Sequence, residues 1–172
     1  MSSPPDGPLH ATVDHYQVRV RTDPRASSMA LFERVRERLF SYDLFPPRLM
    51  QSIVCPSGSV TEGAAIVQRL ILGPVALEMA VRVIAVWDRE RDGMREAGFT
   101  YATIAGHPEC GIATFQVRLH TGGPVLILVD ARSRPGLLLT RLGRPVARAF
   151  QRGITKAALR RLANTSVRHS VL

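Results

Sequence analysis

A long region in which apolar and polar residues alternate constrains the fold more than any other feature. It runs from about Arg48 to Ala131 and is divided by short turns rich in Gly, Pro and Ser. Its clearest segment places every second residue on one apolar face: Val75, Leu77, Met79, Val81, Val83, Ala85 and Trp87. A period of two is typical of strands with one buried face. Because such short turns cannot form the long crossovers of a parallel sheet, we predict an antiparallel meander.

The segments on either side of this region predict one more strand and the helices. Residues 12–21 alternate as a first strand, and Ser28 is suited to cap a helix that carries Leu31, Val35 and Leu39 on one side. Near the other end, Pro135 and Pro145 suit first helical positions. We therefore expect a short helix over residues 137–142 and a longer helix over residues 145–163.

These elements together predict an α+β fold of the helix-grip type. In this architecture, a curved antiparallel sheet of about seven strands wraps around a long C-terminal helix. A length of 172 residues fits one domain. We expect this domain at residues 12–164, between an N-terminal tail (1–11) with several Pro residues and a short C-terminal tail (165–172).

The positive charge is concentrated at the C-terminal end. The formal net charge is +9, and after Asp130 there are ten Arg or Lys residues and no Asp or Glu. Six of them recur every three or four residues as one stripe: Arg141, Arg144, Arg148, Arg152, Lys156 and Arg160. An anionic membrane surface or an acidic partner would compensate such a stripe. The alternative is that the stripe is the solvated outer face of the helix. Nucleic acid is disfavoured, because aromatic residues make up only 6% of the chain and no nucleic-acid-binding motif accompanies the stripe.

Composition also bears on location and cofactors. No apolar run approaches the roughly 20 residues of a membrane-spanning helix, and residues 1–10 do not resemble a signal peptide, so we expect a cytoplasmic protein. Cys55 and Cys110 have no neighbours in metal-ligand spacing, so no metal site is predicted. No cofactor is expected. The oligomeric state is not fixed by the sequence, and a homodimer is one option.

The turn between Phe99 and Phe115 holds the candidate catalytic residues. His107 lies between Gly106 and Pro108 and is followed two positions later by Glu109. A histidine in a stiff turn can transfer a proton near neutral pH, with the carboxylate orienting it. The alternative is that both side chains only bind backbone groups and lock the hairpin.

A second set of candidates shares strand faces that we expect to line the interior. Tyr101 is a catalytic candidate beside His107 and Glu109, because its hydroxyl would be a polar point among apolar side chains. The predicted ligand-binding residues are Met79, Val81, Trp87, Phe99, Thr103, Phe115 and Phe150. The alternative is an ordinary core in which Tyr101 and Thr103 satisfy their hydrogen bonds internally. Asp130 and Arg132, at the end of the last strand, are interpreted as a salt bridge, the alternative being a pair at the mouth of the cavity.

The motif Tyr101-Ala-Thr103-Ile-Ala-Gly106-His107-Pro108-Glu109-Cys-Gly111, with the later Ser133-Arg134-Pro135, resembles an uncharacterised bacterial and plant family. That family is known only as a domain of unknown function, and it is similar to the START-like (SRPBCC) helix-grip superfamily. The superfamily contains lipid carriers, plant hormone receptors and polyketide aromatase/cyclases, so the resemblance implies an apolar ligand held between sheet and helix. This chain departs from the family at Ile112 and Ala113, where Glu-Glu is usual.

The resemblance implies two main functions. The first is a cofactor-free cyclase, dehydratase or isomerase of polyketide-like secondary metabolism, in which Tyr101, His107 or Glu109 would move protons. The second is a carrier or sensor that binds a hydrophobic or amphipathic small molecule without chemistry. A third function, suggested by the basic stripe alone, is binding to an anionic surface or nucleic acid.

Overall fold

The computed structural model describes residues 12–21, 27–104, 107, 109–135 and 144–164. In this part of the chain the strands and helices follow in the order β1 (Thr12–Arg19), α1 (Ser28–Phe40), β2 (Met50–Cys55), β3 (Ala65–Leu72), β4 (Val75–Arg91), β5 (Met94–Thr103), β6 (Glu109–His120), β7 (Val125–Pro135) and α2 (Arg144–Ala163). The predicted helix over residues 137–142 lies outside the described residues.

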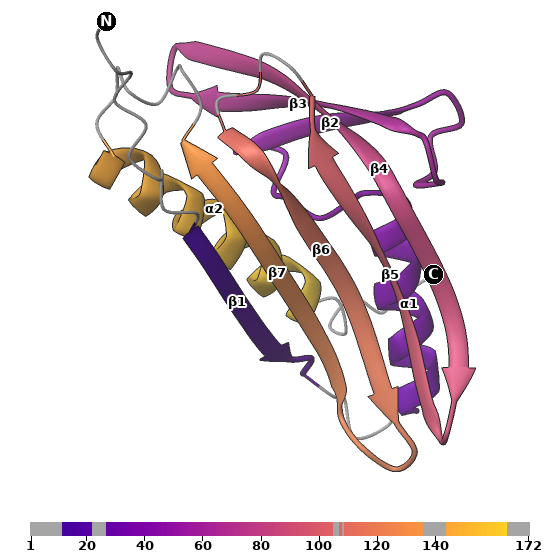
Figure 1. Cartoon of the computed structure of the whole chain (residues 1–172). Coiled ribbons are helices and arrows are strands. Elements are labelled where there is room, and N and C mark those ends of the chain that lie inside the picture. The colour runs from indigo at the N-terminus through magenta and orange to yellow at the C-terminus, as the bar shows by residue number, and fades with distance from the viewer. Residues whose placement is uncertain (1–11, 22–26, 105–106, 108, 136–143, 165–172) are drawn as a thin grey trace, which may run out of the picture.

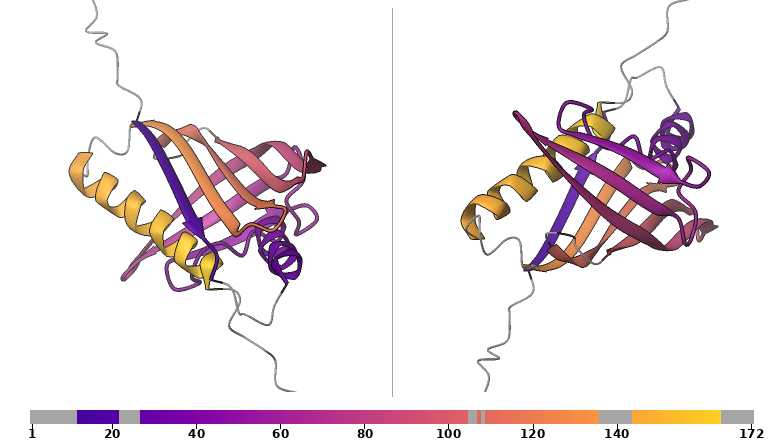
Figure 2. Two further views of the ribbon diagram at one scale, coloured as in Figure 1. Left: turned by 90° about the horizontal axis from the view of Figure 1, so that it is seen from below. Right: turned by 90° about the horizontal axis from the view of Figure 1, so that it is seen from above.

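The strands form one antiparallel sheet with the order β1-β7-β6-β5-β4-β3-β2. The six strands from β2 to β7 are a meander, and β1 is added at the β7 edge. Both helices lie against the same face of the curved sheet (Figures 1 and 2). We call this face the inner face and the opposite one the outer face. The predicted helix-grip architecture is confirmed.

Helix α1 is confirmed, and it begins one residue earlier than its sequence predicts. The hydroxyl of Ser27, one residue before the predicted cap, accepts a hydrogen bond from the Ala30 N–H at 3.1 Å. The residues that α1 buries follow helical spacing: Leu31, Phe32, Val35 and Leu39. This apolar stripe presses on the inner face near β5, β6 and β7.

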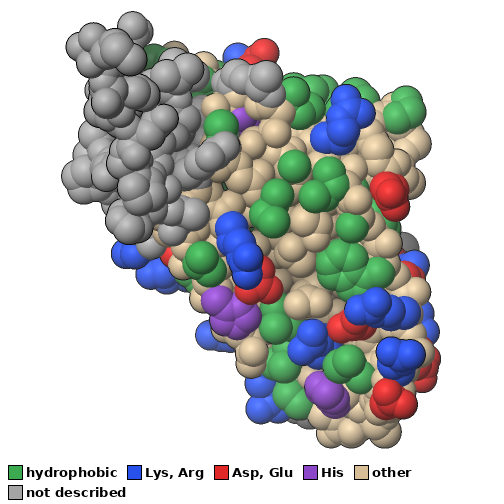
Figure 3. All heavy atoms as spheres, in the orientation of Figure 1, with side chains coloured by type: hydrophobic (Ala, Val, Ile, Leu, Met, Phe, Trp, Pro, Cys, Tyr) green, Lys and Arg blue, Asp and Glu red, His purple; other side chains and the backbone are tan. Residues whose placement is uncertain are grey.

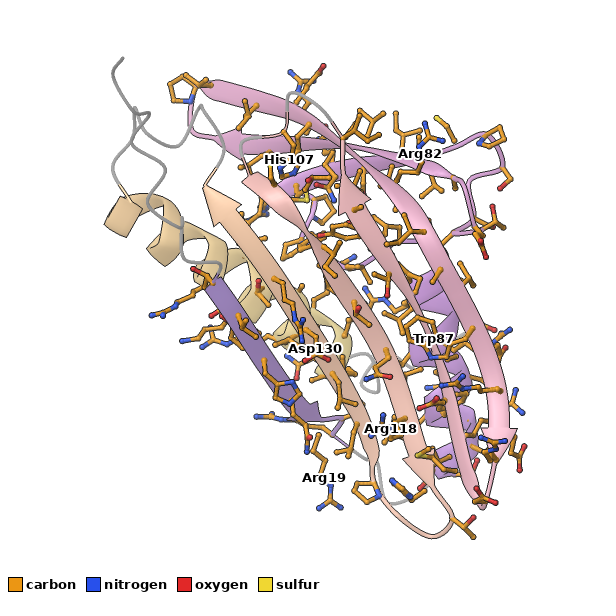
Figure 4. All side chains as sticks on the ribbon, viewed as in Figure 1. Arg19, Arg82, Trp87, His107, Arg118 and Asp130 are labelled. Atoms are coloured by element: carbon orange, nitrogen blue, oxygen red, sulfur yellow. The ribbon has the colours of Figure 1, made fainter. Side chains whose placement is uncertain are left out.

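Strand β4 changes face partway along its length. The β4–β5 register shifts between Val83 and Ala85, so that Val86 rather than Ala85 pairs with Phe99. A bulge of this kind adds one residue to one strand and reverses its subsequent alternation. The prediction that Trp87 shares a face with Val81 and Val83 is therefore wrong. Trp87 pairs with Gly98 and lies on the outer face, which is turned toward the viewer in Figure 4.

The turn after β4 explains how such a long hairpin closes. Asp92 and Gly93 both have left-handed φ angles, of 52° and 71°. Two successive left-handed residues form the turn that matches the twist of a two-residue hairpin. The β4–β5 hairpin is thereby fixed in register from its tip.

The C-terminal half of helix α2 packs against the rest of the protein. Among the α2 side chains that the structure describes (152–163), Ala158, Leu159, Leu162 and Ala163 are buried. The Ala163 carbonyl accepts a hydrogen bond from the Arg21 N–H at 3.3 Å. Asp43, just beyond α1, binds Arg161 of α2 at 2.7 Å and Arg38 of α1 at 2.7 Å. One carboxylate thus joins the C-terminal ends of both helices.

Candidate functional site

The inner face has a floor made mostly of small side chains, with the large Tyr101 at its edge, next to a row of large ones. Register pairs place Tyr101, Ala113, Ala131 and Asp14 side by side on β5, β6, β7 and β1. The neighbouring positions toward the sheet end are Thr103, Gly111 and Ser133. We call these seven residues the open floor. All of them except Ala113 are only half-buried.

The next row of the inner face is filled and closed. It contains Val86, Phe99, Phe115, Val129 and Tyr16, of which the central three are buried. Phe99 and Phe115 stack with ring centroids 5.6 Å apart, and Tyr101 stacks on Phe115 at 5.8 Å. The inner face therefore passes within one row from a packed aromatic core to a partly accessible floor, and Tyr101 lies at the border.

Helix α2, which packs against β7 and β1, carries several small residues. Ile154 is half-buried and packs against the core, and Ala157 is also half-buried. Gly153 is exposed, and a Cβ added to it would meet no atom within 4 Å. The open space at Gly153 therefore lies on the solvent side of α2.

A buried polar chain approaches the open floor from the core. The amide Nε2 of Gln68 donates a hydrogen bond to the Tyr42 hydroxyl at 2.5 Å. The Tyr42 hydroxyl is also hydrogen-bonded to Tyr101. Tyr42 and Gln68 are 2% and 3% exposed. Burial, reinforced by the neighbouring Tyr101, raises the pKa of Tyr42 well above its usual value of 10.0, and the bond from Gln68 only partly opposes this.

The backbone of Tyr42 explains how its side chain reaches the core. Its φ angle is 55°, in the left-handed region that normally favours glycine. The Tyr42 N–H bonds to the Leu39 carbonyl and the Asp43 N–H to the Arg38 carbonyl, which is the pattern of a Schellman helix end. Tyr42 thus occupies the position where a helix end usually has Gly. Its ring contacts Phe45 and Phe99 at centroid distances of 6.0 and 5.9 Å.

Most of the predicted ligand-binding residues do share the inner face. Val81 pairs with Thr103 of β5 and with Ile66 of β3, and Met79 pairs with Gln68. Val81 is fully buried, so it contributes to the core rather than to an accessible surface. Trp87 is separated from this group by the sheet itself. The side chain of Phe150 lies outside the described residues.

Thr103 makes the contacts expected of a structural tie. Its hydroxyl accepts a hydrogen bond from the Gly111 N–H at 3.0 Å and lies 3.4 Å from the Gly111 carbonyl. Gly111 itself is sterically required, because a Cβ there would come within 2.2 Å of the Arg132 carbonyl oxygen. These contacts join the ends of β5 and β6 next to the turn that contains His107.

The proposed His–Glu pair stays a prediction. His107 is half-buried at the sheet end where β5 finishes and β6 begins, and its N–H bonds to the Ile104 carbonyl at 3.1 Å (Figure 4). The side chain of Glu109 lies outside the described residues. Tyr101 is the catalytic candidate for which the structure gives a hydrogen-bonded environment.

The outer face shows where Asp130 and Ile112 lie. Asp130 has His15 as its partner, at 2.5 Å between Oδ1 and Nδ1, because the register places His15 of β1 directly opposite it. The interpretation of Asp130 with Arg132 is corrected accordingly. Ile112 points outward and is 44% exposed, whereas Ala113 is inward beside Tyr101. Figure 3 shows hydrophobic and charged side chains interspersed over this face.

The described part of the basic stripe faces solvent. Arg152, Lys156 and Arg160 are exposed on α2, whereas Arg161 turns toward Asp43. The side chains of Arg141, Arg144 and Arg148 lie outside the described residues. Within the described chain, no helix is long and apolar enough to cross a membrane, and no group of three His, Cys, Asp or Glu side chains is placed to hold a metal ion.

Sequence reasoning missed Tyr42 and Gln68 as parts of the site. A signal for Gln68 was available, since it is the one polar residue among the inward positions Ile66, Gln68 and Leu70 of β3. A lone amide on a buried strand face requires a partner. The bond from Tyr42 to Tyr101 had no such signal, because it depends on the left-handed turn after α1.

Comparisons with solved structures agree with this architecture. The truncated norcoclaurine synthase of Thalictrum flavum is 15% identical, with 94% of this chain and 96% of that chain covered and a TM-score of 0.53. The same enzyme in complex with dopamine and hydroxybenzaldehyde is 14% identical over 89% and 86% of the chains, with a TM-score of 0.51. The hypothetical protein jhp0584 of Helicobacter pylori is 11% identical over 95% and 91%, with a TM-score of 0.55. At such identities the likeness shows the fold.

The sequence comparisons identify the family. No curated protein matches the chain. The family model for the domain of unknown function DUF1990 matches residues 2–161. The resemblance seen in the motif from Tyr101 to Gly111 is thereby confirmed, and the chain belongs to the DUF1990 family, with the START-like helix-grip fold.

Proposed function

We propose that this protein binds a hydrophobic or amphipathic small molecule on the open floor, between the sheet and α2. The observation that carries the proposal is the change from a filled aromatic row to half-buried small residues on one face. Ligand sites combine apolar surface with a few polar groups that fix orientation, and the open floor joins the small Ala113, Ala131 and Gly111 to the polar groups of Tyr101, Thr103, Ser133 and Asp14. The fold likeness to an enzyme crystallised with two small aromatic molecules supports the proposal by analogy.

The test fills the floor with a larger side chain. In Ala131→Phe, the added ring would occupy the space above the small residues, and we expect affinity for anilinonaphthalene sulfonate to fall at least about tenfold. Ala102→Phe is the matched control, because Ala102 lies on the outer face opposite Ile112. Fluorescence titration measures both affinities, and thermal unfolding confirms that each variant is folded. Equal probe affinity in the wild type and Ala131→Phe would refute the proposal.

Native mass spectrometry of the purified protein gives the identity of the bound molecule. An apolar molecule that co-purifies with the wild type and is lost from Ala131→Phe would connect the identification to the open floor. A molecule retained equally by both proteins would place the site elsewhere.

Cofactor-free acid–base chemistry is a narrower form of the same function. It is favoured by the position of the Tyr101 hydroxyl at the border of the floor. With the co-purified molecule as substrate, Tyr101→Phe and His107→Asn would lower turnover and largely preserve binding in an enzyme. A carrier would show no turnover to lose.

Binding to an anionic membrane surface is a second candidate, favoured by the exposed side chains of Arg152, Lys156 and Arg160. Replacing all three with Gln is expected to abolish salt-sensitive sedimentation with phosphatidylserine vesicles. The matched control replaces Arg48, Arg69 and Arg91, which are exposed elsewhere, with Gln. An equal loss in both triple variants would indicate a net-charge effect and contradict a specific surface.

A further inference from the structure

Strand β1 has an outer edge whose backbone groups follow from the pairing register. It is the last strand of the sheet, with β7 on one side (Figure 1). The Val20 N–H bonds to the Val125 carbonyl at 2.9 Å, and this pair continues the β1–β7 register. In an antiparallel ladder every second residue bonds to the neighbouring strand, and the others direct their N–H and C=O groups to the opposite side. Four residues of β1 therefore point these groups away from β7: Val13, His15, Gln17 and Arg19.

These outward groups are available for pairing. Each of the four residues presents one N–H and one C=O, and within the described chain no other strand lies beside them. The next outward N–H, that of Arg21, bonds to the Ala163 carbonyl at 3.3 Å, so the end of α2 occupies the edge at that point. The edge over residues 13–19 can therefore accept a further strand, in the manner by which extended peptides add to sheets.

Helix α2 presents cations beside this edge. It packs against β7 and β1, whereas α1 packs against β5, β6 and β7, so the β1 edge lies on the side of α2 that faces away from α1. Arg161 turns toward Asp43, next to α1. At about 100° per residue, Lys156 and Arg152 point roughly 140° and 180° away from Arg161 around the helix axis. The exposed cations of α2 therefore border the β1 side: Arg152, Lys156 and Arg160.

The positive charge continues onto the outer face. Arg19 of β1 and Arg132 of β7 are exposed there. Of the two carboxylates close by, Asp130 is paired with His15, and the side chain of Asp14 is half-buried on the inner face. Figure 3 shows Lys and Arg side chains along this margin of the molecule. A strand added to β1 would thus lie between basic groups on both faces of the sheet.

Charge decides which partner fits the edge. A second copy of the chain paired through β1 would bring two basic α2 helices together, and each copy carries a formal net charge of +9. Like charges placed opposite one another in a sheet are destabilising. An extended segment rich in Asp or Glu would instead bring carboxylates to the α2 cations and to Arg19.

We infer that the β1 edge docks an extended acidic segment of a partner protein, which adds an eighth strand to the seven-stranded sheet. Backbone hydrogen bonds to the four outward residues hold the segment, and its acidic side chains contact the cations of α2. The four outward residues are not part of the open floor, so the docking does not depend on the small molecule proposed to bind there.

A synthetic peptide tests the docking. The probe is a fluorescent heptapeptide of alternating Glu and Thr, which matches the length of residues 13–19, and its counterpart has Lys in place of Glu. Fluorescence anisotropy gives the affinity of each, and we expect the wild type to prefer the Glu peptide at least about tenfold. The Glu peptide N-methylated at all its amides keeps its charge but cannot donate backbone hydrogen bonds, and it should bind at least about tenfold more weakly. Equal affinities in either comparison would overturn the inference.

Gln17→Pro tests the edge from the side of the protein. Proline removes an N–H that points away from β7, so the β1–β7 ladder is kept while peptide affinity should fall at least about tenfold. Gln17→Thr retains the N–H and is the matched control, and thermal unfolding checks that both variants are folded. If Gln17→Pro does not fold, the N-methylated peptide still decides the question. A wild-type dimer in sedimentation equilibrium that Gln17→Pro dissociates would overturn the inference, because the edge would then hold a second copy.

Charge reversal tests the role of α2. Arg152→Glu/Lys156→Glu should reverse the preference, so that the Lys peptide binds more tightly than the Glu peptide. Arg48→Glu/Arg91→Glu changes the net charge equally at exposed positions elsewhere and should keep the original preference. The same reversal in both double variants would indicate a net-charge effect and contradict the inference. Dependence on the α2 cations with no effect of Gln17→Pro would also contradict it, because a basic surface alone, as in binding to an anionic membrane, does not need the β1 backbone.

Discussion

Tyr42 keeps a backbone conformation that glycine adopts more easily, and its side chain explains why. Placing a non-glycine residue in the left-handed region costs on the order of 1 kcal/mol. The phenol offsets this by filling the core between Phe45 and Phe99 and by satisfying the buried amide of Gln68. Tyr42 therefore stabilises the protein through core packing and through its hydrogen bond with Gln68, although its backbone conformation in the turn is unfavourable.

Removing only the hydroxyl isolates the polar part of this role. Tyr42→Phe keeps the ring and the backbone strain but leaves Gln68 without its acceptor, so we expect a loss of about 1–3 kcal/mol in the free energy of unfolding. Tyr42→Phe/Gln68→Met removes both partners and should recover most of that loss. Urea unfolding measures the two values. A double variant as unstable as the single one would show that the bond is not the cause.

Alkaline titration provides a second prediction about the same side chain. Burial raises the pKa of Tyr42 above the usual value of 10.0, so folding favours the protonated form. This contribution to stability is complete below pH 10 and is lost as the pH rises through the raised pKa of the folded state. Tyrosinate absorbance should therefore show Tyr42 ionising only together with unfolding. Ionisation of all three tyrosines in the folded protein would contradict this.

At the level of the elements, two glycines predict opposite responses to the same substitution. In Gly98→Ala on β5, the new Cβ would lie 2.5 Å from the Phe115 carbonyl oxygen and 2.8 Å from Trp87, so we expect destabilisation of about 1–3 kcal/mol. In Gly153→Ala on α2, the Cβ meets open space and the helix gains about 0.5–1 kcal/mol. Thermal unfolding compares them directly. Stabilisation by Gly98→Ala would mean that β5 and β6 separate readily there.

The elements also show what the sequence could predict. Alternation along β3, β4 and β7 predicted the meander, and the spacing of Leu31, Val35 and Leu39 predicted α1, because both depend on local periodicity. The bulge at Ile84 has no such signal. Apolar residues continue to alternate through Trp87, as they would in a regular strand, so the sequence pattern does not reveal the extra residue. The placement of Trp87 failed for that reason.

The candidate site was also predictable only in part, because local periodicity reveals residues on one strand but not contacts between distant segments. Tyr101, Phe99 and Phe115 were found because they alternate on their own strands. The link to Tyr42 and Gln68 joins residues 26 or more positions apart, through a turn whose strain no propensity predicts. Long-range hydrogen bonds of this kind follow from the three-dimensional arrangement alone.

For the whole molecule, Asp43 is the point where the two helices are tied together. Burial opposes its ionisation, but the hydrogen bonds and charges of Arg161 and Arg38 outweigh it and lower the pKa of Asp43. A lowered pKa gives stability that is present above the unfolded-state value of 3.8 and is lost as the pH falls through the folded-state pKa. The molecule should loosen at this junction in acid.

Asp43→Asn tests this tie. Because the carboxylate is partly exposed and screened, we expect a loss of about 1 kcal/mol or less near neutral pH. The difference from the wild type should shrink below the pKa of Asp43, where the wild-type carboxylate is also neutral. Thermal unfolding across pH measures it, with Asp92→Asn in the hairpin turn as the control. A pH-independent difference would indicate a steric cause.

The boundary between the filled aromatic row and the open floor has an evolutionary consequence. Residues such as Phe99, Phe115 and Val129 maintain the fold, whereas small neighbours such as Ala113 and Ala131 determine the shape of the space above them. Substitutions in the second group can alter which molecule fits without unfolding the protein. Descendants of one ancestral chain could thus acquire new ligands through changes at a few positions of the floor, while the rest of the sheet is conserved by selection for folding.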